Sequence, residues 1–479
     1  MAGIGIQLNK FYKRRSLFAR VSGFAYILGV SVLPMVLVIV AIIVMGRING
    51  LDNELLARRE LFSASVLYCF IFSLLAASLF NAVFSRYLSD IIYDEKYAAI
   101  RPCFIYGMLI NAIAGSAFAI PFYVRAYFVS DIGIWYLFFS YFLFMGLLFS
   151  FYSMLYLSIT KDYVKITCFY LAGMVVAVLL SRGLIVWFSL QTDFAMLIAL
   201  SIGFLIVAGL NTALTFSYFR ENDGSYTGVN SYFRTYWQII FSNFLYILSL
   251  YVHNFVFWHS DLGMTIRSVY TIAEPYDMAS FLALLTSISA TAIFISNTET
   301  DFHEMYKAFS ESLTGGRYSD IEAAKGRMFD SLSAGLLSLV RVQFTISVVL
   351  FLLFIIFMPR LGFAGMVMQI YPVLAAGYFV IFLAYSSILY LYYFDDTTGA
   401  LMVTSVMFIV TLVVSYFCRY LPVEFYGLGL FAGSMAGWVI SFFRLRSTSR
   451  NLETHIFCRG TVVKRGKGIR PSSVVYEKK

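Results

Sequence analysis

Apolar residues gather in twelve long stretches along the 479-residue chain, and short polar segments separate them. About 20 mostly apolar residues cross a hydrocarbon core about 30 Å thick as a helix. A transmembrane β-barrel would instead alternate polarity over segments of about ten residues, which continuous apolar runs exclude. The pattern predicts an all-α polytopic membrane protein. We expect its twelve transmembrane helices near residues 21–46, 61–84, 103–123, 133–158, 166–190, 194–217, 236–259, 277–297, 335–358, 371–394, 399–417 and 425–443.

The two longest loops take the same place in two halves of six spans. Residues 85–102 follow the second span, and residues 298–334 follow the eighth. A shared Phe-x-Tyr-Ile-Leu pattern starts at Phe24 and at Phe244. Because six is an even number, the halves would run parallel, and many transporters of this kind bind their substrate between the halves near the midplane. We therefore predict a six-helix lobe over 21–220, a linker over 221–235 and a second six-helix lobe over 236–444.

Basic residues lie mainly in alternate loops. With the N-terminus inside, the inner segments hold 26 of the 35 Lys and Arg residues, the outer loops hold 7, and two lie within spans. The positive-inside rule then places both termini in the cytoplasm. The amphipathic segment 1–20 and the basic tail 445–479 account for much of the net charge of +9. We interpret this charge as topology and contact with anionic lipid, without nucleic-acid binding.

Few residues suggest enzymatic chemistry. The five cysteines are scattered without C-x-x-C spacing, and the four histidines are dispersed. The chain also lacks a phosphate-binding G-x-x-x-x-G-K-[ST] loop and a G-x-S-x-G elbow. We expect no enzyme, no cofactor, no metal site and no cleaved signal peptide. A transport cycle would have to use an ion gradient, a substrate gradient or the work of a partner.

Two arginines fall inside predicted spans. Charged groups at membrane depth cost a few kcal/mol on insertion scales and normally face protein or water. Arg182 lies about 12 Å below the outer end of the fifth span, where it either pairs, snorkels to the surface, or faces a substrate pathway. Arg341 lies closer to the inner surface, where snorkelling is the competing interpretation. Both are candidates for the pathway.

Polar residues around the seventh and eighth spans form a second set of candidates. His253 and Asn254 in the seventh span, and likewise Asn81 in the second, are either hydrogen-bonding contacts between helices or groups that a sugar-binding cavity would need. Glu274 and Asp277 stand at the outer entrance of the eighth span. They either cap a helix start, which carboxylates favour, or form a coupling-ion or gate site.

The loop 298–334 reads as two short helices hinged at Gly315-Gly316. One face of the first helix is apolar, so it either lies on the inner leaflet as an interfacial helix or docks a cytoplasmic partner. The residues of this face are Phe302, Met305, Tyr306 and Phe309.

Several short motifs follow one another along the chain in a characteristic order and spacing. They are Met1-Ala2-Gly3-Ile4-Gly5, Arg86-Tyr87-Leu88-Ser89-Asp90, Glu274-Pro275-Tyr276-Asp277, Ser280-Phe281-Leu282-Ala283, Glu299-Thr300-Asp301-Phe302, Gly315-Gly316 and Tyr393-Phe394-Asp395-Asp396. With these motifs the chain resembles, from Met1 to about Cys458, the integral-membrane transporter subunit of bacterial Pel exopolysaccharide machinery, within the multidrug, oligosaccharidyl-lipid and polysaccharide flippase superfamily. The second motif adds Arg86 and Asp90 to the candidate pathway.

The resemblance implies a two-lobed transporter in the bacterial cytoplasmic membrane. It would export a polysaccharide rich in N-acetylgalactosamine for a biofilm matrix, and it would contact membrane lipids. Its implied partners are a cytosolic glycosyltransferase and other membrane subunits, one of which senses cyclic di-GMP. Polymerisation itself could then push the polysaccharide outward. Two alternatives remain open: an ion-gradient-driven flippase for lipid-linked saccharides or drugs, and a membrane scaffold for the synthase that transports nothing.

Overall fold

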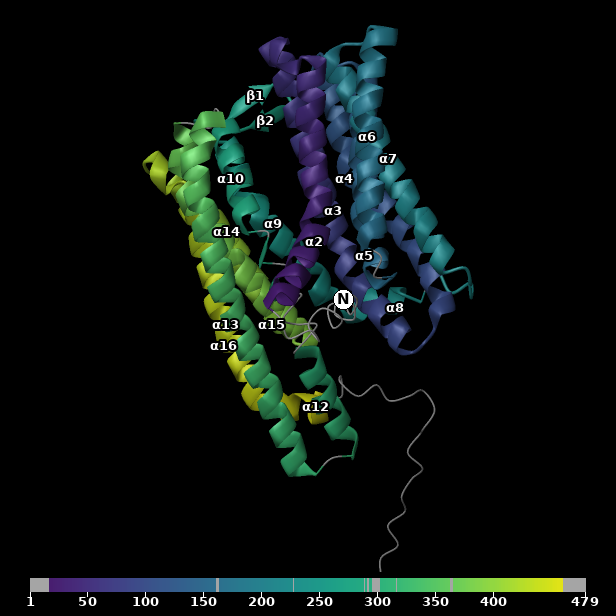
Figure 1. Cartoon of the computed structure of the whole chain (residues 1–479), viewed down its shortest axis with the longest axis vertical. Coiled ribbons are helices and arrows are strands. Elements are labelled where there is room, and N and C mark those ends of the chain that lie inside the picture. The colour runs from purple at the N-terminus through teal and green to yellow at the C-terminus, as the bar shows by residue number, and fades with distance from the viewer. Residues whose placement is uncertain are drawn as a thin grey trace, which may run out of the picture.

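Helices make up nearly all of the described chain, as the apolar spans predict (Figure 1). The computed structural model describes residues 17–160, 163–226, 228–287, 289–290, 293–294, 302–315, 317–361 and 365–459. The helices of the first half are α2 (Leu17–Asn49), α3 (Leu56–Tyr93), α4 (Ile100–Val129), α5 (Ile134–Thr160), α6 (Tyr163–Phe188), α7 (Thr192–Tyr218) and the short α8 (Asn230–Thr235). Those of the second half are α9 (Trp237–Trp258), α10 (Glu274–Ser287), α12 (His303–Gly315), α13 (Tyr318–Phe357), α14 (Met366–Tyr393), α15 (Thr397–Cys418) and α16 (Leu428–Arg459).

Among the described residues, eleven helical segments are long and apolar enough to cross a membrane. They correspond to eleven of the twelve predicted spans. The other predicted span, 277–297, begins within α10, and the residues beyond Ser287 are only partly described. The prediction of an all-α polytopic membrane protein is therefore confirmed.

Two helices extend well beyond the spans predicted for them. Helix α3 has 38 residues and α13 has 40, which corresponds to about 57 and 60 Å at 1.5 Å per residue. Helix α3 thus takes up much of the predicted loop 85–102. The predicted second short helix of 298–334 is instead the first part of α13, because no glycine pair or proline interrupts it after Tyr318. Helix α12 packs beside this projecting part of α13 (Figure 1).

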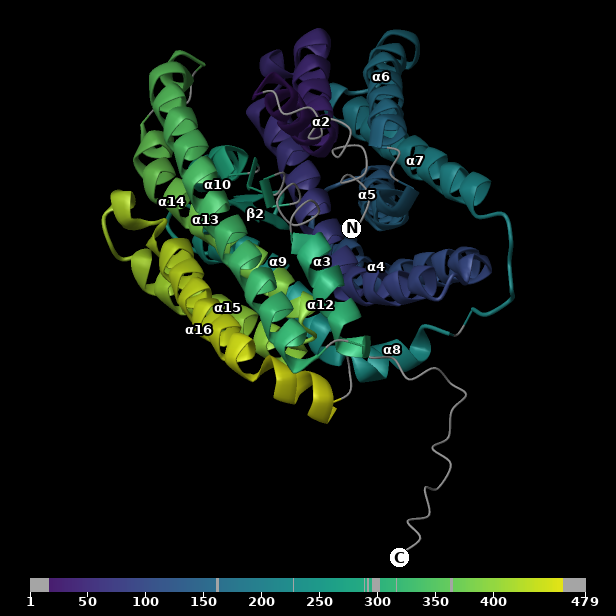
Figure 2. The same ribbon diagram turned by 60° about the horizontal axis from the view of Figure 1, so that its bottom comes forward.

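The helices pack as two lobes, each with a core of its own. In the first lobe, α5, α6 and α7 contact one another, α2 lies on α6, and α3 lies on α5. In the second lobe, α15 and α16 pair closely, with α9, α10 and α14 around them. The view in Figure 2 shows the two groups side by side. The exact lobe boundaries predicted above remain predictions.

Helices α3 and α9 form the seam between the lobes. At one end of the seam, the chain after α9 forms an antiparallel hairpin of β1 (Met264–Ile266) and β2 (Tyr270–Ile272), in which Thr265 pairs with Thr271. We call this the hairpin end, and the opposite end, where α12 lies, the α12 end (Figure 1).

Candidate functional site at the seam between the lobes

Tyr68 of α3 joins the lobes at the hairpin end. Its hydroxyl donates to the carbonyl of Thr271 at 2.9 Å and accepts from the amide of the same residue at 3.0 Å. Its ring stacks on Trp258 of α9, with centroids 4.9 Å apart. One side chain of the first lobe thus holds both the hairpin and the end of α9.

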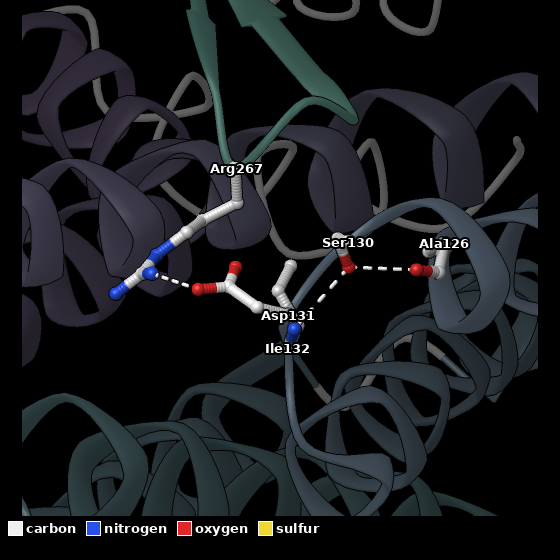
Figure 3. Close-up of polar contacts among 5 residues, drawn as sticks. All are labelled: Ala126, Ser130, Asp131, Ile132 and Arg267. Carbon is white, nitrogen blue, oxygen red and sulfur yellow. Dashed lines mark hydrogen bonds and ion pairs between the residues drawn. The ribbon is translucent and has the colours of Figure 1, made fainter.

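The hairpin makes a second contact across the seam (Figure 3). Arg267, which lies in the turn of the hairpin, forms an ion pair with Asp131 in the segment between α4 and α5. Ser130 closes the end of α4 beside it, donating to the carbonyl of Ala126 at 2.6 Å and accepting from the amide of Ile132. Both charged groups are well exposed, and ion pairs of this kind contribute at most about 1 kcal/mol. The ion pair is therefore too weak to hold the hairpin on the first lobe by itself.

Side chains of the hairpin also enter the core of the first lobe. The hairpin follows α9 in the sequence, yet its buried residues Ile266, Tyr270 and Ile272 belong to the buried cluster that α3, α5 and α7 build. The hairpin is therefore a strap that starts in the second lobe and is anchored in the first.

Asp277 positions Trp258 from within the second lobe. Its carboxylate accepts from the Trp258 indole at 2.9 and 3.0 Å, from the Asn254 side chain at 2.7 Å and from the Ala273 amide at 3.0 Å. All of these groups are donors, so a cation would have to displace them to bind here. The arrangement fixes the indole in the orientation in which Tyr68 stacks on it.

A buried polar cluster lies next to this carboxylate. His253 Nδ1 is 2.8 Å from the Tyr276 hydroxyl, and its Nε2 is 3.5 Å from the Tyr378 hydroxyl. The Ser280 hydroxyl is 2.8 Å from that of Tyr378 and donates to Asn254 Oδ1 at 3.4 Å. These bonds join α9, α10 and α14. The structure thus brings together three predicted candidates, His253, Asn254 and Asp277, in the interior of the second lobe.

Different residues close the seam at the α12 end. Arg86 of α3 lies 3.6 Å from an Asp395 oxygen, in the connection between α14 and α15, and its guanidinium lies over the ring of Tyr236. Asp90, one turn further on, accepts from the Tyr232 hydroxyl of α8 at 2.8 Å. Of the two residues in the family motif, Arg86 therefore reaches across the seam to the second lobe, whereas Asp90 holds α8, which precedes the seam helix α9.

Between the two closed ends lies a groove of about 280 Å³. Helices α3, α4 and α9 supply most of its walls, and aromatic rings dominate them. The lining residues are Tyr68, Cys69, Phe72, Leu75, Ala76, Leu79, Phe118, Ala119, Phe122, Tyr123, Phe144, Phe244, Leu248 and Phe255.

The remaining pathway candidates do not line this groove. Arg182 and Arg341 lie on exposed faces of α6 and α13, and Glu274 is exposed at the start of α10. Asn81 of α3 is half-buried, and its Oδ1 atom is buried without a hydrogen bond. A pathway role for these four stays a prediction. Within the described ranges, no three His, Cys, Asp or Glu side chains gather closely enough to hold a metal ion.

The apolar face of α12 is turned toward the protein itself. Phe302 and Phe309 are buried, and the Phe302 ring lies 4.9 Å from Tyr390 and 5.4 Å from Tyr393 of α14. Met305 and Tyr306 are partly buried against the same cluster. Partner docking by this face stays a prediction, and in this packing a partner would meet the opposite, exposed face of α12 first.

We expect Asp277→Asn to destabilise the hairpin end. An amide keeps only one acceptor oxygen and presents donors where Trp258 and Ala273 also donate, and a buried hydrogen bond lost in this way costs about 1–3 kcal/mol. Thermal unfolding of the purified protein measures the effect. Glu274→Gln is the matched control, because Glu274 is exposed at the same helix start, and its change should stay within about 0.5 kcal/mol. Equal melting of the two variants would show that the Asp277 bonds contribute little.

The fold is similar to that of several solved transporters. A transporter of the MOP superfamily from Pyrococcus furiosus aligns with a TM-score of 0.60 and 11% identity, over 90% of this chain and 96% of that one. The Vibrio cholerae MATE transporter VcmN gives 0.57 and 13%, over 93% and 98%. The eukaryotic MATE transporter AtDTX14 gives 0.55 and 11%, over 96% and 100%. At such low identity the likeness establishes the fold, a two-lobed flippase-type arrangement.

A family model matches nearly the whole sequence. It is described as PelG, "Putative exopolysaccharide Exporter (EPS-E)", and it covers residues 1–457. No curated protein matches the sequence.

Proposed function

Because the chain belongs to the PelG family of exopolysaccharide exporters, we propose that it exports a Pel-like polysaccharide, rich in N-acetylgalactosamine, across the cytoplasmic membrane of a bacterium. The family and the fold are those of a membrane transporter. The polymer would pass along the seam between the lobes and contribute to a biofilm matrix.

The observation that carries this proposal is how the seam is closed. Two separately packed lobes meet along α3 and α9, and each end is held by its own small set of contacts. The hairpin end uses Tyr68, Trp258 and the Arg267–Asp131 pair, and the α12 end uses the Arg86–Asp395 pair. Because the sets share no residue, one end can open while the other stays closed. Transporters with parallel repeats bind their cargo between the halves, and a polymer that is pushed outward while it grows would need both sets of contacts to open at once.

The orientation and partners follow from the charge pattern and the family. We place the α12 end and both termini in the cytoplasm, where 26 of the 35 basic residues would then lie. A cytosolic glycosyltransferase would deliver the growing polymer to that end, together with membrane subunits, one of them sensing cyclic di-GMP. Polymerisation would then drive the polysaccharide outward without a coupling ion.

Deletion of the gene should abolish extracellular polymer while glycosyltransferase activity in lysates persists. Complementation with the wild-type gene should restore secretion. Arg86→Ala should leave the protein co-purifying with the synthase but lower secretion several-fold, because it removes the ion pair to Asp395 and the contact with Tyr236. A scaffold that transports nothing would secrete normally with this change. Unchanged secretion in the deletion strain would refute export altogether, and an altered lipid-carrier or drug-efflux profile would favour a flippase.

A further inference from the structure

We propose that the groove between α3, α4 and α9 binds a hydrocarbon chain, the acyl tail of a membrane lipid. Its lining includes eight aromatic rings and no charged residue. Its volume of about 280 Å³ is close to the lower end of ligand pockets, roughly 300–1,000 Å³. It would accept a slender apolar group.

The few polar atoms in the groove already have partners. The Tyr68 hydroxyl is used by both backbone groups of Thr271. The Tyr123 hydroxyl lies 3.0 Å from that of Ser140, and the Cys69 thiol donates to the Ser140 carbonyl at 3.3 Å. A sugar hydroxyl placed here would have to compete with these bonds, and each buried hydrogen bond that is lost costs about 1–3 kcal/mol. In this closed arrangement the groove therefore suits methylene groups rather than sugars.

Part of the groove wall is exposed at membrane depth. Phe72 and Phe118, two of its lining residues, are 40% and 65% exposed. Phe72 stands near the middle of the predicted span 61–84, and Phe118 lies five residues before the end of the predicted span 103–123. At that depth the surroundings of a membrane protein are lipid tails. The occupant is therefore a chain from the leaflet at the hairpin end.

A chain in this groove would contact both lobes at once. Phe118 and Phe122 come from the first lobe, and Phe244, Leu248 and Phe255 come from the second. Phe255 also stacks parallel to Phe72, with centroids 5.8 Å apart, directly across the seam. Any movement of α9 relative to α3 would reshape the groove, so lipid occupancy and the closed hairpin end should stabilise each other.

The full-length protein in nanodiscs that contain a phosphatidylethanolamine with a diazirine near the end of its acyl chain tests the proposal. After illumination, digestion and mass spectrometry should place label on groove residues such as Leu75, Phe244 and Phe255. Label found only on outward-facing residues such as Leu179 and Ile113 would overturn it, whatever the variants do. This readout does not depend on secretion. The lipid proposal can therefore fail while the export proposal stands, and the export proposal can fail while the lipid proposal stands.

Ala119→Trp should lower the labelling of groove residues at least fivefold. Ala119 lines the groove and is buried, so the indole would fill the groove. Ile120→Trp is the matched control, because the neighbouring Ile120 is exposed and does not line the groove, and it should keep the label. If Ala119→Trp does not fold, Ala76→Leu shortens the groove from α3 and should lower the label in the same way. Full labelling in a folded groove-filling variant contradicts the proposal.

Discussion

Cross-linking the strap to the first lobe should reduce polymer secretion to the level of the deletion strain. Cysteines introduced as Asp131→Cys and Arg267→Cys replace the exposed ion pair and can be joined by a flexible bis-maleimide, with the native cysteines first changed to alanine. The cross-link prevents the hairpin from leaving the first lobe, so the hairpin end could not open. Secretion by cells before and after treatment measures the loss, which should exceed tenfold.

A cross-link within one lobe provides the control. Glu54 and Thr192 are joined by a hydrogen bond of 2.8 Å inside the first lobe, so Glu54→Cys with Thr192→Cys gives a comparable link that does not cross the seam. This pair should retain secretion. Without reagent, the cysteine pair at 131 and 267 should also secrete nearly normally, because an exposed ion pair contributes little. Normal secretion after complete cross-linking of 131 to 267 would mean that the hairpin end stays closed during export.

The spans could be predicted from the sequence because membrane insertion depends on local composition. A helix satisfies its own backbone groups inside the bilayer, so a run of about 20 apolar residues is sufficient evidence for each one. The ends of α3 and α13 could not be predicted in the same way. Their projecting turns, such as 85–93 and 318–334, are polar enough to read as loops, and packing against the rest of the protein keeps them helical.

Part of the polar cluster was also predictable, but its key partner was missed. His253, Asn254 and Asp277 stood out as polar residues at membrane depth, and the structure brings them together. Trp258 gives no such signal in the sequence, because tryptophan is common at membrane interfaces. Its spacing was a usable signal, since residues 254 and 258 are four apart and share one face of α9. That face is the one turned toward Asp277.

The sequence does not predict the strap, because its turn lacks the usual signal. Hairpin turns with positive φ at both central residues strongly favour Asn-Gly or Asp-Gly, whereas here Arg267 and Ser268, in a three-residue connection between Ile266 and Tyr270, have φ values of 49° and 60°. Such conformations cost non-glycine residues about 1 kcal/mol or more each. Tyr68 and Thr271 are also 203 positions apart, and no local pattern relates them. The contact depends on how the two lobes come together.

Exposure alone does not decide the role of a charged candidate. Arg182 is exposed within two turns of the end of α6, so snorkelling to the surface and a pathway role both stay predictions. Asp395, by contrast, stands in a motif that the family resemblance had identified, yet only the structure pairs it with Arg86. Residues in connections between spans carry no depth signal, so their partners depend on the packing of both lobes.

Close packing of α15 and α16 should make the second lobe intolerant of larger side chains at Gly433. Lipid tails are as apolar as leucine, so helices in a membrane associate through close packing of small residues. A Cβ atom at Gly433 would lie 1.9 Å from Thr411 Oγ1 and 2.8 Å from backbone atoms of Met407 and Thr411. The hydroxyl could rotate away, but the backbone of α15 could not move without separating the two helices.

We therefore expect Gly433→Leu to destabilise the protein by at least about 3 kcal/mol, the upper part of the range for overpacked cores, and to abolish most of the folded protein in detergent. Fluorescence-detected size exclusion and thermal unfolding measure both effects. Gly209→Leu introduces the same side chain in α7, where a Cβ atom meets nothing within 4 Å, and should melt close to the wild type. Adding Thr411→Ala should rescue Gly433→Leu only slightly, because the backbone contacts remain. Wild-type melting of Gly433→Leu would mean that α15 and α16 are not in backbone contact, and the hydrogen-bonded cluster of α9, α10 and α14 would then have to hold the second lobe together by itself.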